Sequence, residues 1–135
     1  MKTWMKWAAV FAAVVGAYFL GTYSSNTQSE MSYMMILMED ENFQPGEPMA
    51  MFTEYQDWMY AAREKGVEIS GQELKDEATL IQSDNIIDNP NIGNQKVTGY
   101  FVFNANSKEE AIKIVQLNPH IKYGGSIQLK EYMKR

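Results

Sequence analysis

The side chains that could do acid–base chemistry in this chain centre on its single histidine. His120 stands in the stretch Asn-Pro-His-Ile-Lys-Tyr-Gly-Gly over residues 118–125. An imidazole changes its charge near neutral pH, so it can move a proton once a carboxylate and a pocket are present. We expect Asp40, after the first predicted strand, and Asp88, in a predicted hairpin, to be the nearest carboxylates. The catalytic hypothesis is proton transfer by His120 with one of them; the alternative is a loop histidine that caps a helix or packs at a rim.

Two aromatic residues are the candidates for contact with a ligand. Tyr55 and Trp58 lie on the apolar stripe of a predicted helix. Aromatic side chains on such a stripe commonly belong to a core or an interface, so packing is the competing interpretation of both residues.

Metal and thiol chemistry are not predicted. The sequence has no cysteine, which excludes disulfides, thiolate metal sites and a cysteine nucleophile. Methionines gather over residues 31–38, but strand alternation sends them to opposite faces, and methionine commonly fills irregular core space. The acidic run over residues 39–41 lacks the spacing of a calcium-binding loop. We therefore expect no metal and no cofactor.

Length and charge narrow the class of protein further. A chain of 135 residues with 45% hydrophobic and 21% charged residues has the size and composition of one globular domain with a short appendage. The formal net charge is −5, and lysine and arginine form no cluster that would neutralise phosphates. Nucleic acid is therefore not an expected partner.

The first thirty residues are typical of an export signal. Lys2 and Lys6 precede an apolar run over residues 7–21, and a polar segment follows. This pattern predicts either a cleaved signal peptide or a signal-anchor with a polar linker over residues 1–30, because the run is long for the first and short for the second. In both cases we expect the domain over residues 31–135 to lie outside the cytoplasm, as a secreted, periplasmic or membrane-anchored protein that meets the membrane only through this segment.

The remaining chain predicts alternating strands and helices. Hydrophobic periodicity, capping residues and turn residues give the expected elements. These are a buried strand over Ser32–Met38, a helix over Met49–Lys65, short strands at Val67–Ile69 and Thr79–Gln82, a long hairpin tip over Ser83–Gln95, a strand over Lys96–Ala105, a helix from Ser107 to Leu117, and a last strand around Ile127–Leu129.

The order of these elements predicts an α+β fold. Two helices with so few strands must cover one face of a sheet, which favours a two-layer ferredoxin-like sandwich with the order β-α-β-β-α-β. The other face of the sheet would then be open. Face-to-face pairing of two copies into a dimeric, α/β-barrel-like assembly would cover it, so we expect a homodimer.

Several segments together resemble the YCII-related family, in particular its DGPF-type branch. The resemblance rests on Tyr33–Glu41, Glu64–Leu74, Thr98–Ile114 and Asn118–Leu129, in that order. It implies a dimeric ferredoxin-like fold with a cleft between sheet and helices, a function that is mostly uncharacterised in the family, and occasional small-molecule enzymes such as a dehydrochlorinase-like member.

The chain also departs from the family pattern at the positions that matter for catalysis. The loop that names the branch appears here as Asp-Asn-Pro-Asn over residues 88–91. Members suspected of acid–base chemistry resemble one another in a first-helix histidine and an Asp-Pro after the second helix. Here Tyr55 falls near the first position, and Asn118-Pro119 stands at the second. The histidine–aspartate pair therefore does not carry over.

Two functions remain from the sequence. The first is a dimeric small-molecule-binding module. The alternative is a lyase- or isomerase-type enzyme that uses His120 with a nearby carboxylate. The loss of the paired residues favours the first.

Overall fold

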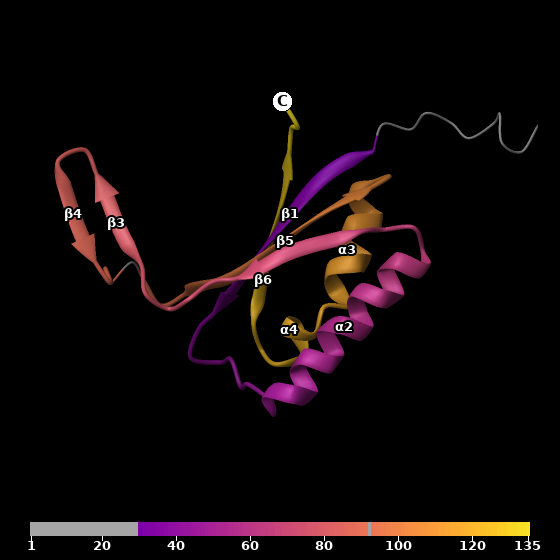
Figure 1. The fold of residues 1–135 in the computed structure, drawn as a ribbon, viewed down its shortest axis with the longest axis horizontal. Helices are drawn as coiled ribbons and strands as arrows, with labels where there is room; N and C mark the ends of the chain where they lie inside the picture. Colours follow the sequence, from indigo (N-terminus) through magenta and orange to yellow (C-terminus); the bar gives the residue numbers. More distant parts are fainter. Residues whose placement is uncertain (1–29, 92) are drawn as a thin grey trace, which may run out of the picture.

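The computed structural model describes residues 30–91 and 93–135. Its main sheet is antiparallel, with the strand order β2-β5-β1-β6. Both long helices lie on the same face of this sheet (Figure 1). The elements of this two-layer arrangement are β1 (Met31–Glu39), α2 (Pro48–Glu64), β2 (Ile69–Glu73), β5 (Lys96–Ala105), α3 (Lys108–Gln116) and β6 (Ser126–Tyr132).

The predicted α+β class is confirmed. Apart from a separate hairpin, β3 (Thr79–Gln82) and β4 (Asn85–Asp88), and a short helix described below, the chain order is strand, helix, strand, strand, helix, strand. That order, together with the antiparallel sheet, is compatible with a ferredoxin-like fold. The first predicted strand, β1, does lie in the interior of the sheet.

The core lies between the sheet and the two helices. Alternate residues of β1, namely Tyr33, Met35 and Leu37, are buried on the helix-facing side. Helix α2 contributes Trp58 and α3 contributes Val115 to the same cluster. Burying an apolar side chain of this size stabilises a fold by about 1.5–3 kcal/mol, so this cluster fixes how the helices sit on the sheet.

The sequence signals for the helix ends are reproduced. The side chain of Ser107 accepts a hydrogen bond from the backbone N–H of Glu110 at 3.1 Å, as the predicted capping box requires. The carboxylate of Glu110 reaches back one residue further than expected, to the backbone N–H of Asn106 at 2.8 Å. Helix α2 ends before Gly66, whose φ of +80° is a conformation that favours glycine.

Two elements are absent from the sequence prediction, and β2 extends past the predicted short strand, from Ile69 to Glu73. The stretch predicted as a long hairpin tip contains a strand, β4, which pairs with β3 in a two-stranded arm. Figure 1 shows this arm projecting away from the sandwich, at the end opposite to the helices. The second difference is a one-turn helix, α4 (Pro119–Lys122), where the sequence predicted a loop. Its capping residue is Asn118, and proline in the first turn suits a helix start.

The face of the sheet opposite the helices is only half-buried. Met34 and Ile36 of β1 and Val102 of β5 alternate with the core residues and therefore point to this side. Polar residues flank them on the outer strands: Lys130 of β6 lies beside Met34, and Ser70 of β2 lies beside Val102. The surface thus has an apolar centre and polar edges.

The predicted export segment, residues 1–30, lies almost entirely outside the described residues. Within residues 30–91 and 93–135, no helix is both long enough and apolar enough to cross a membrane.

Candidate functional site

His120 is buried in the turn of α4 and is held by backbone partners. Its side chain is 1% exposed, and Nε2 lies 2.9 Å from the backbone oxygen of Met38 at the end of β1. A carbonyl oxygen only accepts, so Nε2 carries a proton and donates it. The ring also packs against Phe43, with 5.1 Å between the ring centroids. These contacts join α4 to the end of the central strand.

The chain packs just as closely on the other side of His120. The backbone N–H of Gly125 donates to the backbone oxygen of His120 at 3.0 Å. A Cβ atom at Gly125 would overlap the imidazole ring. Glycine is therefore required here by close approach, before the chain enters β6.

The two predicted partner carboxylates have backbone and hydroxyl donors of their own. Asp40 accepts a hydrogen bond from the backbone N–H of Asn42 at 2.8 Å, in a turn that leads to Phe43. Asp88 accepts from the hydroxyl of Thr79 at 2.8 Å, across the β3–β4 arm. Figure 1 places that arm far from α4. Proton transfer by His120 with either residue stays a prediction, and no contact between His120 and either carboxylate supports it.

Tyr55 belongs to the helix–sheet interface. Its ring stacks on Phe101 of β5, with 6.1 Å between the centroids. Burial raises the pKa of the Tyr55 hydroxyl well above its ordinary value, and the nearby carboxylates Glu39 and Glu73 raise it further. The phenol is therefore neutral at physiological pH, which suits a packing residue.

Trp58 combines a structural contact with a place on a groove. Its side chain is 7% exposed and packs edge-on against Phe101, with 5.3 Å between the centroids. The indole Nε1–H donates to the backbone oxygen of Ile114 at 3.0 Å, which ties α2 to the last turn of α3. One face of the indole then forms part of the groove wall.

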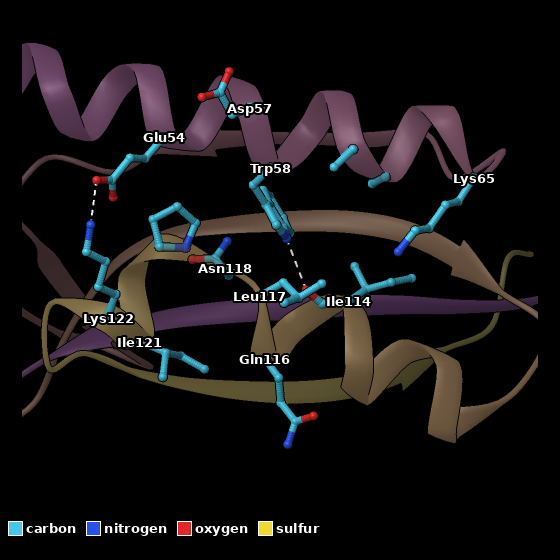
Figure 2. A pocket seen from close by; sticks show the side chains of 13 residues that line it. Glu54, Asp57, Trp58, Lys65, Ile114, Gln116, Leu117, Asn118, Ile121 and Lys122 are labelled. Carbon is cyan, nitrogen blue, oxygen red and sulfur yellow. Dashed lines mark hydrogen bonds and ion pairs between the residues drawn. The ribbon is translucent and has the colours of Figure 1, made fainter.

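The groove runs between α2 on one side and the end of α3 with α4 on the other (Figure 2). Its volume is about 710 Å³. The wall is mainly apolar, with a few polar and charged groups at its ends and floor. The lining residues of α2 are Glu54, Asp57, Trp58, Ala61, Ala62 and, after its last turn, Lys65; those of the α3–α4 side are Ile114, Gln116, Leu117, Asn118, Pro119, Ile121 and Lys122.

Asn118 is the unusual residue of this groove. Its side chain is 2% exposed, and Oδ1 accepts a hydrogen bond from the backbone N–H of His120 at 2.9 Å. That bond assigns the orientation of the amide and leaves Nδ2 buried without an acceptor among the described residues. Figure 2 shows this nitrogen pointing toward α2, beside Trp58. A buried donor without a partner costs about 1–3 kcal/mol, and an incoming acceptor would recover part of that cost.

The charged residues of the groove differ in their surroundings. Glu54 and Lys122 form an ion pair at 2.6 Å that links α2 to α4 at one end. The hydrogen bond from Lys122 lowers the pKa of the Glu54 carboxyl, and the same hydrogen bond raises the pKa of the Lys122 ammonium. Figure 2 shows Lys65 at the other end, with its ammonium directed toward the groove, and Asp57 with its carboxylate directed away.

The groove offers hydrogen bonding and apolar contact more than bond-breaking chemistry. His120 is not among its lining residues, and neither is Tyr55. In the described part of the chain, no three His, Asp or Glu side chains gather in a group that could hold a metal ion. Of the residues named from the sequence as site candidates, only Trp58 lines the groove.

Comparison with known proteins assigns the chain to no family. No protein-family model matches the chain, and no curated protein is significantly similar to it. The resemblance to the YCII-related family therefore stays a prediction.

Asn118 was missed as a candidate site residue, although the sequence carried part of the signal. Asparagine directly before proline is a good helix cap, and a capping asparagine has one amide oxygen in use and one amide nitrogen left over. Whether that nitrogen meets water or lies buried depends on the packing of α2, which the local sequence does not reveal.

Proposed function

We propose that this protein is a small-molecule-binding module whose site is the groove between α2 and the α3–α4 side. The observation that carries the proposal is the buried Nδ2 of Asn118, a residue that lines the groove; this nitrogen has no acceptor among the described residues. Buried polar groups in folded proteins are nearly always hydrogen-bonded. A ligand acceptor is the partner that best explains this exception.

The dimensions and composition of the groove support the proposal. A volume of about 710 Å³ falls within the range of roughly 300–1,000 Å³ that is typical of ligand pockets. Such pockets have mostly apolar walls with a few placed polar groups, and this groove has that composition. Because Nδ2 is itself covered, a ligand's oxygen reaches it only after a wall side chain rotates, and rotamer changes of this kind are common on binding.

The proposal includes homodimerisation through the open face of the sheet. The half-buried Met34, Ile36 and Val102 form an apolar centre, and the outer strands supply polar edges. An apolar centre with a polar rim is the composition expected of a protein interface. The paired sheets would leave the helix layer, and with it the groove, facing solvent on both copies.

The proposal also includes export. The basic residues Lys2 and Lys6 before the apolar run over residues 7–21 support a signal peptide or a signal-anchor, with the domain outside the cytoplasm. Fractionating cells and measuring the mass of the mature protein test this part: a chain recovered in the cytoplasm would contradict it.

A titration with a simple probe tests the binding function. N-hexylacetamide has one carbonyl acceptor and one hydrocarbon chain, and the indole N–H signal of Trp58 in ¹⁵N-labelled full-length protein reports on the groove. We expect a saturable shift of this signal. The Asn118→Asp variant keeps an oxygen to cap His120 but removes the donor, so we expect it to bind the probe about tenfold more weakly, or about 1.4 kcal/mol.

Two further variants make the outcome decisive. Asn85→Asp makes the same charge change on the exposed β3–β4 arm and should leave binding unchanged. Ala61→Trp introduces a large side chain at an exposed position of the groove wall, without altering the core, and should block the probe. A probe that binds all three variants as tightly as the unaltered protein would overturn the groove as the site.

Sedimentation equilibrium tests the dimer separately. Ile36→Lys places a charge in the apolar centre of the open sheet face, and we expect it to give a monomer. Ile86→Lys, on the arm, is the matched control and should leave the dimer intact. A monomeric unaltered protein would overturn this part of the proposal without touching the groove.

A further inference from the structure

We propose that the ligand of the groove is an elongated, carbonyl-bearing carboxylate: its carbonyl oxygen accepts from Asn118, its hydrocarbon body lies along Trp58 and Leu117, and its anionic end faces Lys65. This inference rests on the proposed binding function and adds the class of ligand and its orientation.

Asn118 determines the chemistry of one end of the ligand. Its Nδ2 is an amide donor, and no acceptor within the described residues satisfies it. The ion pair of Glu54 and Lys122 lies next along the groove and already balances its own charge. A neutral oxygen acceptor therefore fits this end, since a further charge there would compete with the existing pair. Amide and ketone carbonyls meet this requirement.

Apolar side chains determine the middle of the ligand. Beyond Asn118 the wall consists of the indole of Trp58 with Ile114 and Leu117 opposite (Figure 2). Leu117 is 66% exposed, although it lies in the structured turn between α3 and α4. Covering it with a hydrocarbon chain would remove apolar surface from water at about 25 cal/mol per Å². Gln116 also lines this stretch, but its amide is directed away from α2 (Figure 2).

Lys65 determines the sign of charge at the far end. Figure 2 shows its ammonium directed into the groove near Ile114, past the last turn of α2. In the described part of the chain, Lys65 has no carboxylate within ion-pair distance, whereas Lys122 does. Neither carboxylate of the groove neutralises Lys65, because Glu54 is paired with Lys122 and Asp57 is directed away from the groove. An anion is therefore favoured at this end.

A matched series of probes separates the three parts of this inference. N-hexylacetamide is neutral, 6-acetamidohexanoate replaces its terminal methyl group with a carboxylate, and N-(6-aminohexyl)acetamide adds an amine instead. We expect the carboxylate to bind about two- to fivefold more tightly than the neutral probe at low salt, as an exposed ion pair allows, and the amine to bind most weakly. Raising the salt concentration should reduce this preference.

Lys65→Gln should remove the preference for the carboxylate, measured as the ratio of the affinities of 6-acetamidohexanoate and N-hexylacetamide for the same variant. Lys75→Gln, in the exposed segment between β2 and β3, is the matched control and should retain the preference. Binding of N-hexylacetamide without any preference for the carboxylate, or with a preference for the amine, would overturn this inference and leave the binding function standing. If no probe shifts the Trp58 signal, the binding function itself is overturned.

Discussion

Asn118 and His120 are two buried polar residues in one turn, and they differ in whether their donors are satisfied. The imidazole Nε2 of His120 donates to the backbone oxygen of Met38, and its ring is packed between Phe43 and Gly125. The amide Nδ2 of Asn118 has no acceptor in the described residues and is covered by the side chains of the groove that Asn118 lines. Histidine, a residue type common in catalysis, is thus used for structure at position 120. Asparagine, a common helix cap, has the donor without a partner at position 118.

Whether a buried polar group already has a hydrogen-bond partner, more than its residue type, separates a structural group from a binding group. A hydrogen-bonded buried group stabilises the fold, because breaking its contact would leave a partner unpaired. An unpaired buried donor weakens the fold and gains most from a ligand. Four changes test how much the satisfied polar contacts in and around this turn stabilise the fold, in order of decreasing expected effect.

Removing the His120 side chain should have the largest effect. His120→Ala leaves a cavity and strips the Met38 carbonyl of its donor, so we expect the free energy of unfolding to fall by about 3 kcal/mol. Urea denaturation followed by circular dichroism measures this. A loss below about 0.5 kcal/mol would contradict the structural role of the imidazole.

Crowding the same ring should have the next largest effect. Gly125→Ala places a methyl group where the imidazole lies, and overpacking of this kind costs about 1–3 kcal/mol. The double variant with His120→Ala tests the cause, because the methyl group then has room. Equal costs of Gly125→Ala in both backgrounds would show that the ring is not the neighbour that matters.

Trp58→Phe should have a moderate effect. Phenylalanine keeps most of the aromatic packing against Phe101 but cannot donate to the backbone oxygen of Ile114. We expect a loss of about 1 kcal/mol in urea denaturation, as for one hydrogen bond. Trp58→Leu, which removes both interactions, should cost more, and equal losses for the two variants would argue against the hydrogen bond.

The smallest effect should come from acid. The hydrogen bond from Lys122 lowers the pKa of Glu54 in the folded chain, so the pair stabilises the fold above the ordinary carboxyl pKa. Its contribution is lost as the pH falls through the lowered pKa. Both side chains reach solvent, so the effect is small. Melting temperatures of the unaltered protein and Glu54→Gln should differ slightly at neutral pH and converge in acid; a constant difference would contradict this linkage.

Much of the fold could be predicted from the sequence because its signals are local. Ser107 caps α3, and Lys96–Ala105 is rich in branched and aromatic residues, so α3 and β5 lie where the sequence predicts them. Strand β4 is not evident from the sequence because the Asn, Asp and Pro residues around it favour turns. It forms because it pairs with β3, where Leu80 lies opposite Ile87.

Less of the candidate site could be predicted. Trp58 lies on the helix stripe that the sequence shows, and it does reach the groove. The states of Asn118 and His120 depend on contacts with β1 and α2, which are far away in the sequence. A one-turn helix such as α4 also carries too few residues to show a periodic pattern. Local sequence therefore predicts that both residues lie near a helix end, and tertiary packing decides which one retains an unpaired donor.

The side-chain amide signals of Asn118 report directly on whether its Nδ2 donates to a ligand. In ¹⁵N-labelled protein titrated with N-hexylacetamide, we expect one of the two Nδ2 proton signals of Asn118 to move downfield as it donates to the probe's carbonyl. The amide signals of Asn85 on the arm should stay in place. Saturable binding that shifts other groove signals but leaves both protons of Asn118 unmoved would contradict the account.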